Sequence, residues 1–372
     1  MIYRVCLSAF YMRMKVKMSR VLIKRLIEEI NTMTHKEMKI MEVCGTHTQM
    51  ISKLGIRSVL SPKIKLLSGP GCPICVTHEE DIDTAIELLN HNDITIATFG
   101  DLLRVKGTKS CLLDEKSKGK DVIIITSPLA LIQMAEDNKE KKIVFLGVGF
   151  ETTAPIIALT IKTAFEKGLD NLFFLSSIKL MSPILHYMFK QPNNQIQGLI
   201  CPGHVASIKG ANYFTFIVDD YHIPAGVCGF EALDILGGIH HLVKQISENE
   251  KIEFKNLYKR CVRPKGNPTA NQIMKEVFQV SQGEWRGIGK VEGSSLIINK
   301  KYERLDAVKY FDVKIKRLKQ VTKCACSDIL LGKKVPKECP LFNRGCSPLH
   351  PQGPCMISTE GACAIAYQYK EE

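Results

Sequence analysis

Short apolar runs alternate with helical patterns along residues 60–220. Between these runs, stretches such as HEEDIDTAIELLNH and TAPIIALTIKTAFEKG repeat apolar residues at helical spacing. Strand, turn and helix repeated in this way predict an α/β fold whose parallel sheets are covered by helices. Seven runs end in a Gly, Pro or Ser/Thr turn, as buried strands do: KIKLLSGPG, DITIATFGD, DVIIITSP, KIVFLGVGFETT, NLFFLSS, GLICPGHV and FTFIVDD.

A chain of 372 residues favours two or three domains. Seven strands suit two adjacent α/β units around a cleft better than one sheet, with a join near residues 127–145. From about residue 235 the pattern loosens into helical and irregular segments. We therefore predict a non-native or disordered start at 1–17, an N-terminal helix at 18–40 packing on the C-terminal domain, α/β domains at 41–130 and 131–234, and a partly irregular domain at 235–372.

Charge and hydropathy exclude several classes of protein. No apolar run approaches the roughly 20 residues needed to cross a bilayer, and the start has no small-residue cleavage site, so we expect a cytoplasmic protein without membrane contact. The net charge is +13, but the Lys and Arg residues are scattered and not interleaved with aromatic residues. This distribution favours a solvated basic surface over nucleic-acid binding, and it is compatible with a small anion or an acidic partner protein.

Notable residues follow the predicted strands at the turns where α/β proteins place their sites. Cys44-Gly-Thr-His47 follows KIMEV, Cys72-Pro-Ile-Cys75 follows KIKLLSGPG, and His204 follows GLIC. Glu151 follows KIVFLGV, where it either caps a helix or meets a ligand. If the sheets lie side by side, these turns share one cleft.

The Cys72/Cys75 spacing brings two sulfurs close enough to form a reversible disulfide at the start of a helix. The alternative is half of a zinc site, but no second pair with this spacing occurs outside the tail. We therefore favour a redox-active dithiol.

Six of the fourteen cysteines lie beyond residue 323, more than a core requires. In a reducing compartment such clusters favour metal binding or catalysis over static disulfides. The spacing has no paired zinc knuckles and suits an iron–sulfur cluster wrapped by irregular chain, which would make 235–372 an iron–sulfur domain. Its expected ligands are Cys339, Cys346, Cys363 and one of Cys324 and Cys326, with Cys355 as a spare thiol; the motif leaves the choice between Cys324 and Cys326 open.

The ordered motifs resemble the HypD family of nickel–iron hydrogenase maturation proteins from about residue 20 to 370. They are CGTHT, GPGCPIC, TFGDLLRV, GFETTAP, CPGHV, GFEALDIL, RPKGNP, EWRGIG, CPLFNRGCSP and GACAIAY. The resemblance implies a scaffold shared with the small protein HypC, on which iron acquires one carbon monoxide and two cyanide ligands. It also implies that HypE delivers the cyanide as an enzyme thiocyanate, and that the iron then passes to the hydrogenase large subunit.

Carried over to this sequence, the resemblance implies that Cys44 binds the transient iron and that the tail holds a 4Fe-4S cluster. Cys72 and Cys75 would donate electrons or control access. His47, His204 and Glu360 match positions suspected of acid–base or positioning work, although a single histidine is more often structural. The alternative function is a free-standing thiol–disulfide reductase fed by the cluster, which would not need Cys44.

Overall fold

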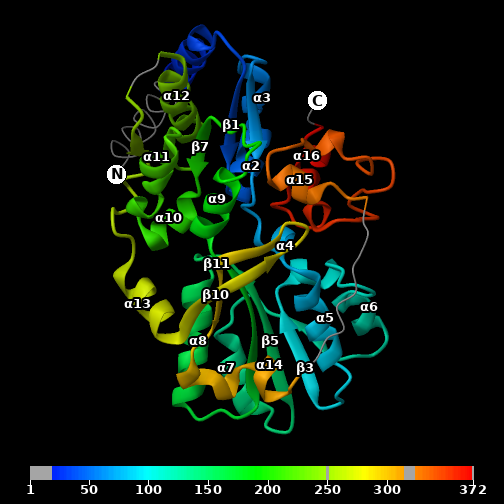
Figure 1. Ribbon diagram of the computed structural model, residues 1–372. Helices are drawn as coiled ribbons and strands as arrows, with labels where there is room; N and C mark the ends of the chain where they lie inside the picture. Colours follow the sequence, from blue (N-terminus) through cyan, green and yellow to red (C-terminus); the bar gives the residue numbers. More distant parts are fainter. Residues whose placement is uncertain (1–18, 249–250, 314–322, 371–372) are drawn as a thin grey trace, which may run out of the picture.

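The computed structural model describes residues 19–248, 251–313 and 323–370. The predicted start at 1–17 lies outside these ranges. Within them the chain forms two separate sheets, one above the other in Figure 1, which confirms the α/β class predicted from the sequence.

The first sheet contains five parallel strands in the order β2-β1-β7-β8-β9. The chain adds β2 on one side of β1 and then β7, β8 and β9 on the other, so the direction of winding changes between β1 and β7. Ligands of such sheets bind at this point, outside the carboxyl ends of the strands. The strands are β1 (Met38–Glu42), β2 (Ile64–Ser68), β7 (Gly198–Cys201), β8 (Ala225–Val227) and β9 (Phe254–Asn256).

The second sheet has the order β10-β11-β6-β5-β3-β4. Strands β3 to β6 are parallel, whereas the hairpin β10–β11 joins antiparallel to β6. The central strand β5 is buried along nearly its whole length because helices pack on both faces. The strands are β3 (Ile94–Thr98), β4 (Val122–Ile124), β5 (Lys142–Gly149), β6 (Leu172–Lys179), β10 (Phe278–Trp285) and β11 (Gly289–Ile298).

Helices fill the connections between strands. The α-helices are α2 (Gly45–Lys53), α3 (Ile56–Val59), α4 (Pro73–Val76), α5 (Glu79–Leu88), α6 (Leu112–Ser117), α7 (Ala130–Asp137), α8 (Ala154–Glu166), α9 (Met181–Phe189), α10 (Gly203–Lys209), α11 (Phe216–Tyr221), α12 (Ala232–Glu248), α13 (Pro268–Val277), α14 (Ala307–Tyr310), α15 (Cys326–Leu330) and α16 (Ala362–Gln368). Short 3-10 helices are η1 (Gly100–Arg104), η2 (Ala211–Phe214), η3 (Lys300–Leu305), η4 (Pro336–Glu338) and η5 (Pro354–Met356).

A helix over residues 19–33 precedes β1 and packs on α12. Ile30 is fully buried in one core cluster with Ile239 and Leu242 of α12, and Glu29 contacts the His240 ring at 3.0 Å. The N-terminal helix thus packs on α12, most of which lies within the segment 235–372; that this segment forms a separate domain stays a prediction. No helix within the described ranges is long and apolar enough to cross a membrane.

Two expectations from the sequence are corrected by the structure. FTFIVDD is helical, not a strand, because it spans the end of η2 and most of α11. Its fully buried residues, Phe214 and Ile217, are three positions apart, which is helical spacing. The segment after residue 235 is also more regular than expected, since it supplies β9 to the first sheet and β10–β11 to the second.

Each sheet contains strands from both sides of the boundary predicted at residue 130. Strands β3 and β4 precede it and β5 and β6 follow it, yet all four share one sheet, while β1 and β2 pair with β7. The division into domains at 41–130 and 131–234 stays a prediction, but it does not separate the sheets. One core cluster contains side chains of both sheets and of the cysteine tail, including Met41, Val144 and Cys363.

Candidate functional site

The turns that carry Cys44 and Cys72 lie against each other. Cys44 follows β1 and is the residue before α2, where its amide donates to Glu42 Oε2 at 3.0 Å. The Gly45 amide reaches the carbonyl oxygen of Gly71 at 3.4 Å. A Cβ on Gly71 would stand 2.3 Å from the Cys44 amide nitrogen, so only glycine permits this approach. The two turns are therefore in contact, while the cleft expected from the sequence stays a prediction.

Cys72 and Cys75 are joined by a disulfide across the start of α4. The Cys75 amide donates to Cys72 Sγ at 3.2 Å, and Pro73 occupies the first helical position, where it loses no hydrogen bond. Both residues are almost completely buried. The bond shows that this pair reaches disulfide geometry within the native fold.

The rings of His47 and His204 both pack against the ring of Phe230. The Phe230 ring centroid is 4.5 Å from that of His47 and 4.2 Å from that of His204. His47 lies in α2, while His204 lies in α10 after β7, so the two rings come from the strands that flank the change in winding. His47 is fully buried, whereas His204 is exposed.

Burial controls protonation around Cys44. It raises the pKa of the Cys44 thiol to about 12 and lowers that of His47 to about 4. His47 is therefore neutral at pH 7; Nε2 lies 3.0 Å from the Gly229 carbonyl oxygen, and Nδ1 has no hydrogen-bond partner among the described residues. A metal that binds Cys44 must displace the thiol proton, and a neutral imidazole can accept one.

The cysteine tail packs on both turns. Helix α16 contacts α2, and η5 contacts α4, so the tail lies beside Cys44 and the dithiol at once (Figure 1). Glu360 accepts a hydrogen bond from Thr46 at 3.1 Å, and burial raises the pKa of this carboxyl. A Cβ on Gly45 would stand 2.4 Å from Glu360 Cβ, so glycine at residue 45 leaves the room that the tail needs to pack beside Cys44.

Four tail cysteines that form no disulfide line one small cavity: Cys324, Cys339, Cys346 and Cys363. Backbone amides point at two of these sulfurs, from Ala325 to Cys339 at 3.5 Å and from Gln352 to Cys346 at 3.3 Å. Burial and the neighbouring thiols raise the pKa of Cys324 to about 11 and that of Cys363 well above its ordinary value. These thiols are therefore protonated and neutral at pH 7 without a metal, and adjacent thiolates at this site would need a metal to offset their charge.

Cys326 is bonded to Cys355, which also lines the cavity. In residues 19–248, 251–313 and 323–370, no group of three or more His, Cys, Asp or Glu side chains is arranged to hold a single metal ion. The ligands of an iron–sulfur cluster need not surround a single ion, since each thiolate binds a different iron. The four cysteines outside the disulfide and the two amide donors are the residues that could hold an iron–sulfur cluster.

The chain matches the family model HypD, described as "Hydrogenase formation hypA family", over residues 21–370. It belongs to the HypD family. It is 39% identical over 339 residues to the hydrogenase maturation factor HypD of Escherichia coli K12, which covers 91% of this chain and 90% of that protein. It is 36% identical over 353 residues to HypD of Rhodobacter capsulatus, covering 93% of each chain. The resemblance seen in the motifs is thereby confirmed.

Two residues at the site were not singled out from the sequence. Phe230 contacts both histidine rings, and Glu42 accepts hydrogen bonds from the Cys44 amide and, at 2.5 Å, from the Thr48 hydroxyl. Phe230 belongs to the GFEALDIL motif shared with the HypD family, which was a usable signal. No sequence signal marked Glu42 as a site residue, because its role depends on the direction in which β1 ends.

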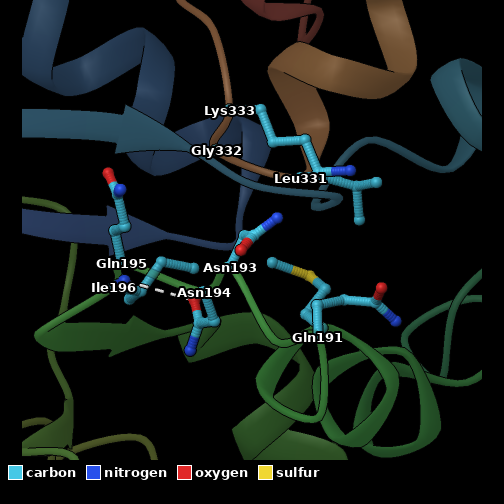
Figure 2. Close-up of a pocket in the computed structure, with 9 residues that line it drawn as sticks. Gln191, Asn193, Asn194, Gln195, Ile196, Leu331, Gly332 and Lys333 are labelled. Atoms are coloured by element: carbon cyan, nitrogen blue, oxygen red, sulfur yellow. Dashed lines mark hydrogen bonds between the residues drawn. The ribbon is translucent and has the colours of Figure 1, made fainter.

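A separate pocket of about 220 Å³ lies where the tail turn Leu331–Lys333 meets the loop before β7 (Figure 2). Its lining includes Asn193, Asn194 and Gln195, and no cysteine or histidine. The loop lies at the amino end of β7, whereas Cys44 lies at the carboxyl end of β1. This pocket is therefore not part of the thiol site.

Proposed function

We propose that this chain is a redox-active scaffold that, together with a HypC-type protein, assembles the iron group of a nickel–iron hydrogenase. On the scaffold the iron would acquire one carbon monoxide and two cyanide ligands, with cyanide delivered by a HypE-type donor. The hydrogenase large subunit would then receive the iron. The observation that carries this proposal is the contact between the Cys44 turn, the Cys72–Cys75 turn and the cysteine tail.

Cys44 would hold the iron. A single soft thiolate suits a low-spin ferrous ion and leaves coordination positions open for diatomic ligands. The buried imidazole of His47 would take up or return a proton, while His204 and Glu360 would position the iron or its incoming ligands. The carboxyl of Glu360 is anchored by Thr46, two residues after Cys44, which fixes its place relative to the iron ligand.

The dithiol would supply electrons in pairs. A thiocyanate, R–SCN, and the two thiols of Cys72 and Cys75 would yield R–SH, hydrogen cyanide and the Cys72–Cys75 disulfide, so atoms and electrons balance. A 4Fe-4S cluster held by Cys339, Cys346, Cys363 and either Cys324 or Cys326 would supply single electrons when bound. The contact between η5 and α4 favours a direct connection between tail and dithiol.

The infrared spectrum of the anaerobically purified complex with the HypC-type partner tests the proposal. Cyanide and carbonyl stretching bands from the complex are the expected result. A fully iron-loaded complex without these bands would favour the alternative, a free-standing thiol–disulfide reductase. The close approach of Gly71 to Cys44 argues against that alternative, because a reductase has no use for a third thiol beside its pair.

A further inference from the structure

Arg286 connects the hairpin β10–β11 to the end of the dithiol helix. Its backbone amide donates to the Val76 carbonyl oxygen at 3.1 Å, and its Nε donates to the Thr77 carbonyl oxygen at 2.6 Å. A third bond, 2.6 Å long, runs from a terminal guanidinium nitrogen to the carbonyl oxygen of Lys106. The residues that follow Cys75 are thus held by a side chain from the other sheet.

The guanidinium is buried as well as bonded. Its side chain is 11% exposed, and its nearest acid is Glu79, at 3.5 Å. Burial lowers the pKa of Arg286, with Glu79, Asp81 and Asp83 opposing that shift, but arginine stays protonated in proteins. A permanent positive charge therefore lies in a poorly solvated place beside α4, where charges act strongly.

We propose that Arg286 is a positioning residue that holds the carboxyl end of α4 and sets the reduction potential of the Cys72–Cys75 pair. The inference rests on the proposed redox role of this pair and adds a determinant of its potential. The backbone amide and the Nε of Arg286 both hold the main chain just after Cys75, and the bond to the Lys106 carbonyl oxygen ties the same guanidinium to the loop after η1. EWRGIG, the motif that contains Arg286, has no other role in the site.

The charge acts on the reduced form of the pair. Reduction adds two electrons to the Cys72–Cys75 bond and two protons, and it yields two thiols in equilibrium with a thiolate. A nearby cation stabilises the thiolate, so it favours reduction. Glu79 opposes this effect because it is the acid closest to the guanidinium. Removing Arg286 and removing Glu79 should therefore shift the equilibrium in opposite directions.

The test equilibrates the full-length chain with mixtures of reduced and oxidised dithiothreitol, alkylates the free thiols and measures labelling of Cys72 and Cys75 by peptide mass spectrometry. Arg286→Gln should shift the equilibrium constant about tenfold toward the disulfide, which corresponds to about 30 mV. Glu79→Gln should shift it toward the dithiol. Arg286→Lys keeps the charge without the planar fork and should fall between Arg286→Gln and the unmodified chain.

Arg304 provides the matched control, because it also donates to two main-chain carbonyls, those of Leu169 and Phe165, far from the dithiol. Arg304→Gln should leave the equilibrium unchanged. Equal constants for Arg286→Gln and the unmodified chain would overturn the inference, as would a shift of the same sign in Glu79→Gln. If Arg286→Gln does not fold, the equilibrium constants of Arg286→Lys and Glu79→Gln test the inference instead, because they should shift in opposite directions. The measurement needs no iron or partner, so missing infrared bands in the complex would count against the scaffold and not against this role.

Discussion

Gly71 lies so close to Cys44 that a Cβ at residue 71 would stand 2.3 Å from the Cys44 amide nitrogen and 2.5 Å from its Cα. The residue before one thiol of the pair therefore touches the backbone of the proposed iron ligand. This contact joins the turn after β2 to the turn after β1, which are adjacent parallel strands. The spacing between Cys44 and the dithiol is thus set by main-chain packing.

Gly71→Ala should separate the two turns. The methyl group meets backbone atoms that cannot rotate away, so we expect a loss of stability on the order of 1–3 kcal/mol and weaker retention of iron. Urea denaturation and iron analysis of the purified complex measure both effects. Gly237→Ala in α12 is the control, because nothing lies within 4 Å of its added Cβ and alanine is favoured in a helix by about 0.5–1 kcal/mol. If both variants retain iron equally, the turn contact does not control the site.

Cys44→Ser should abolish the cyanide and carbonyl infrared bands and hydrogenase maturation, because a serine hydroxyl is a poor ligand for low-spin ferrous iron. The tail cluster and association with the HypC-type partner should be largely unchanged. Cys228→Ser is a demanding control, since Cys228 Sγ lies 3.6 Å from His47 Nε2 and is also fully buried. Wild-type bands in Cys44→Ser, or their loss in Cys228→Ser, would show that another thiol holds the iron.

Most residues of the candidate site were singled out in the sequence because they lie in turns that follow predicted strands. Cys44 and His204 follow strands β1 and β7, which are neighbours, so residues far apart in the chain were expected near one edge. The contribution of Phe230 was not predictable from the sequence, because its contacts with both histidine rings depend on how α10 and the turn after β8 pack. The anchoring of Glu360 by Thr46 likewise required the docking of α16 on α2.

The pattern of apolar residues does not determine which of the two sheets a strand joins, and the reason is physical. A buried run such as β3 or β7 satisfies either sheet equally well, since parallel strands are apolar on both faces. Pairing depends on long-range contacts, which place β7 between β1 and β8. The FTFIVDD error is of another kind, because short apolar runs do not distinguish a strand from a buried helix without their burial pattern.

Cys346→Ser should remove the iron and acid-labile sulfide of the tail, whereas Cys355→Ser should keep them. Cys346 is a free thiol that accepts a backbone hydrogen bond, while Cys355 is bonded to Cys326 and is one thiol more than a cluster needs. Iron and sulfide analysis with visible absorption spectra would measure the effect, with about four of each per chain in the unmodified protein. Stoichiometric zinc without sulfide would contradict the cluster.

The same analysis identifies the first cluster ligand. Cys324 forms no disulfide and lines the cavity with the other thiols, whereas Cys326 becomes available only when its bond to Cys355 is reduced. Of Cys324→Ser and Cys326→Ser, one should lose the cluster and the other should keep it. If both keep it, a ligand outside this pair completes the site.

Stability should fall as the pH rises through the titration of Glu151. The carboxyl is fully buried, with Oε1 accepting hydrogen bonds from the Met181 amide at 2.9 Å and the Tyr213 hydroxyl at 2.8 Å, and Oε2 unpartnered within the described chain. Burial raises the pKa of Glu151 above 4.5. Between pH 4.5 and that raised pKa, the native state keeps a proton that the unfolded state releases. The stabilising contribution is complete below this window and lost above it.

Glu151→Gln removes this proton while keeping an acceptor for Met181 and Tyr213, so its stability relative to the unmodified chain should increase as the pH rises above 4.5. Urea denaturation under reducing conditions at several pH values measures the difference.

Glu276→Gln is the control of opposite sign, because hydrogen bonds from Tyr302 and Lys162 lower the pKa of Glu276 to about 2. Glu276 contributes stability above pH 4.5 that is lost as the pH falls toward 2, so that variant should differ most from the unmodified chain near neutral pH and least in acid. A pH-independent difference for Glu151→Gln would mean that Glu151 is charged in the folded protein, with a cation or a ligand beside Oε2.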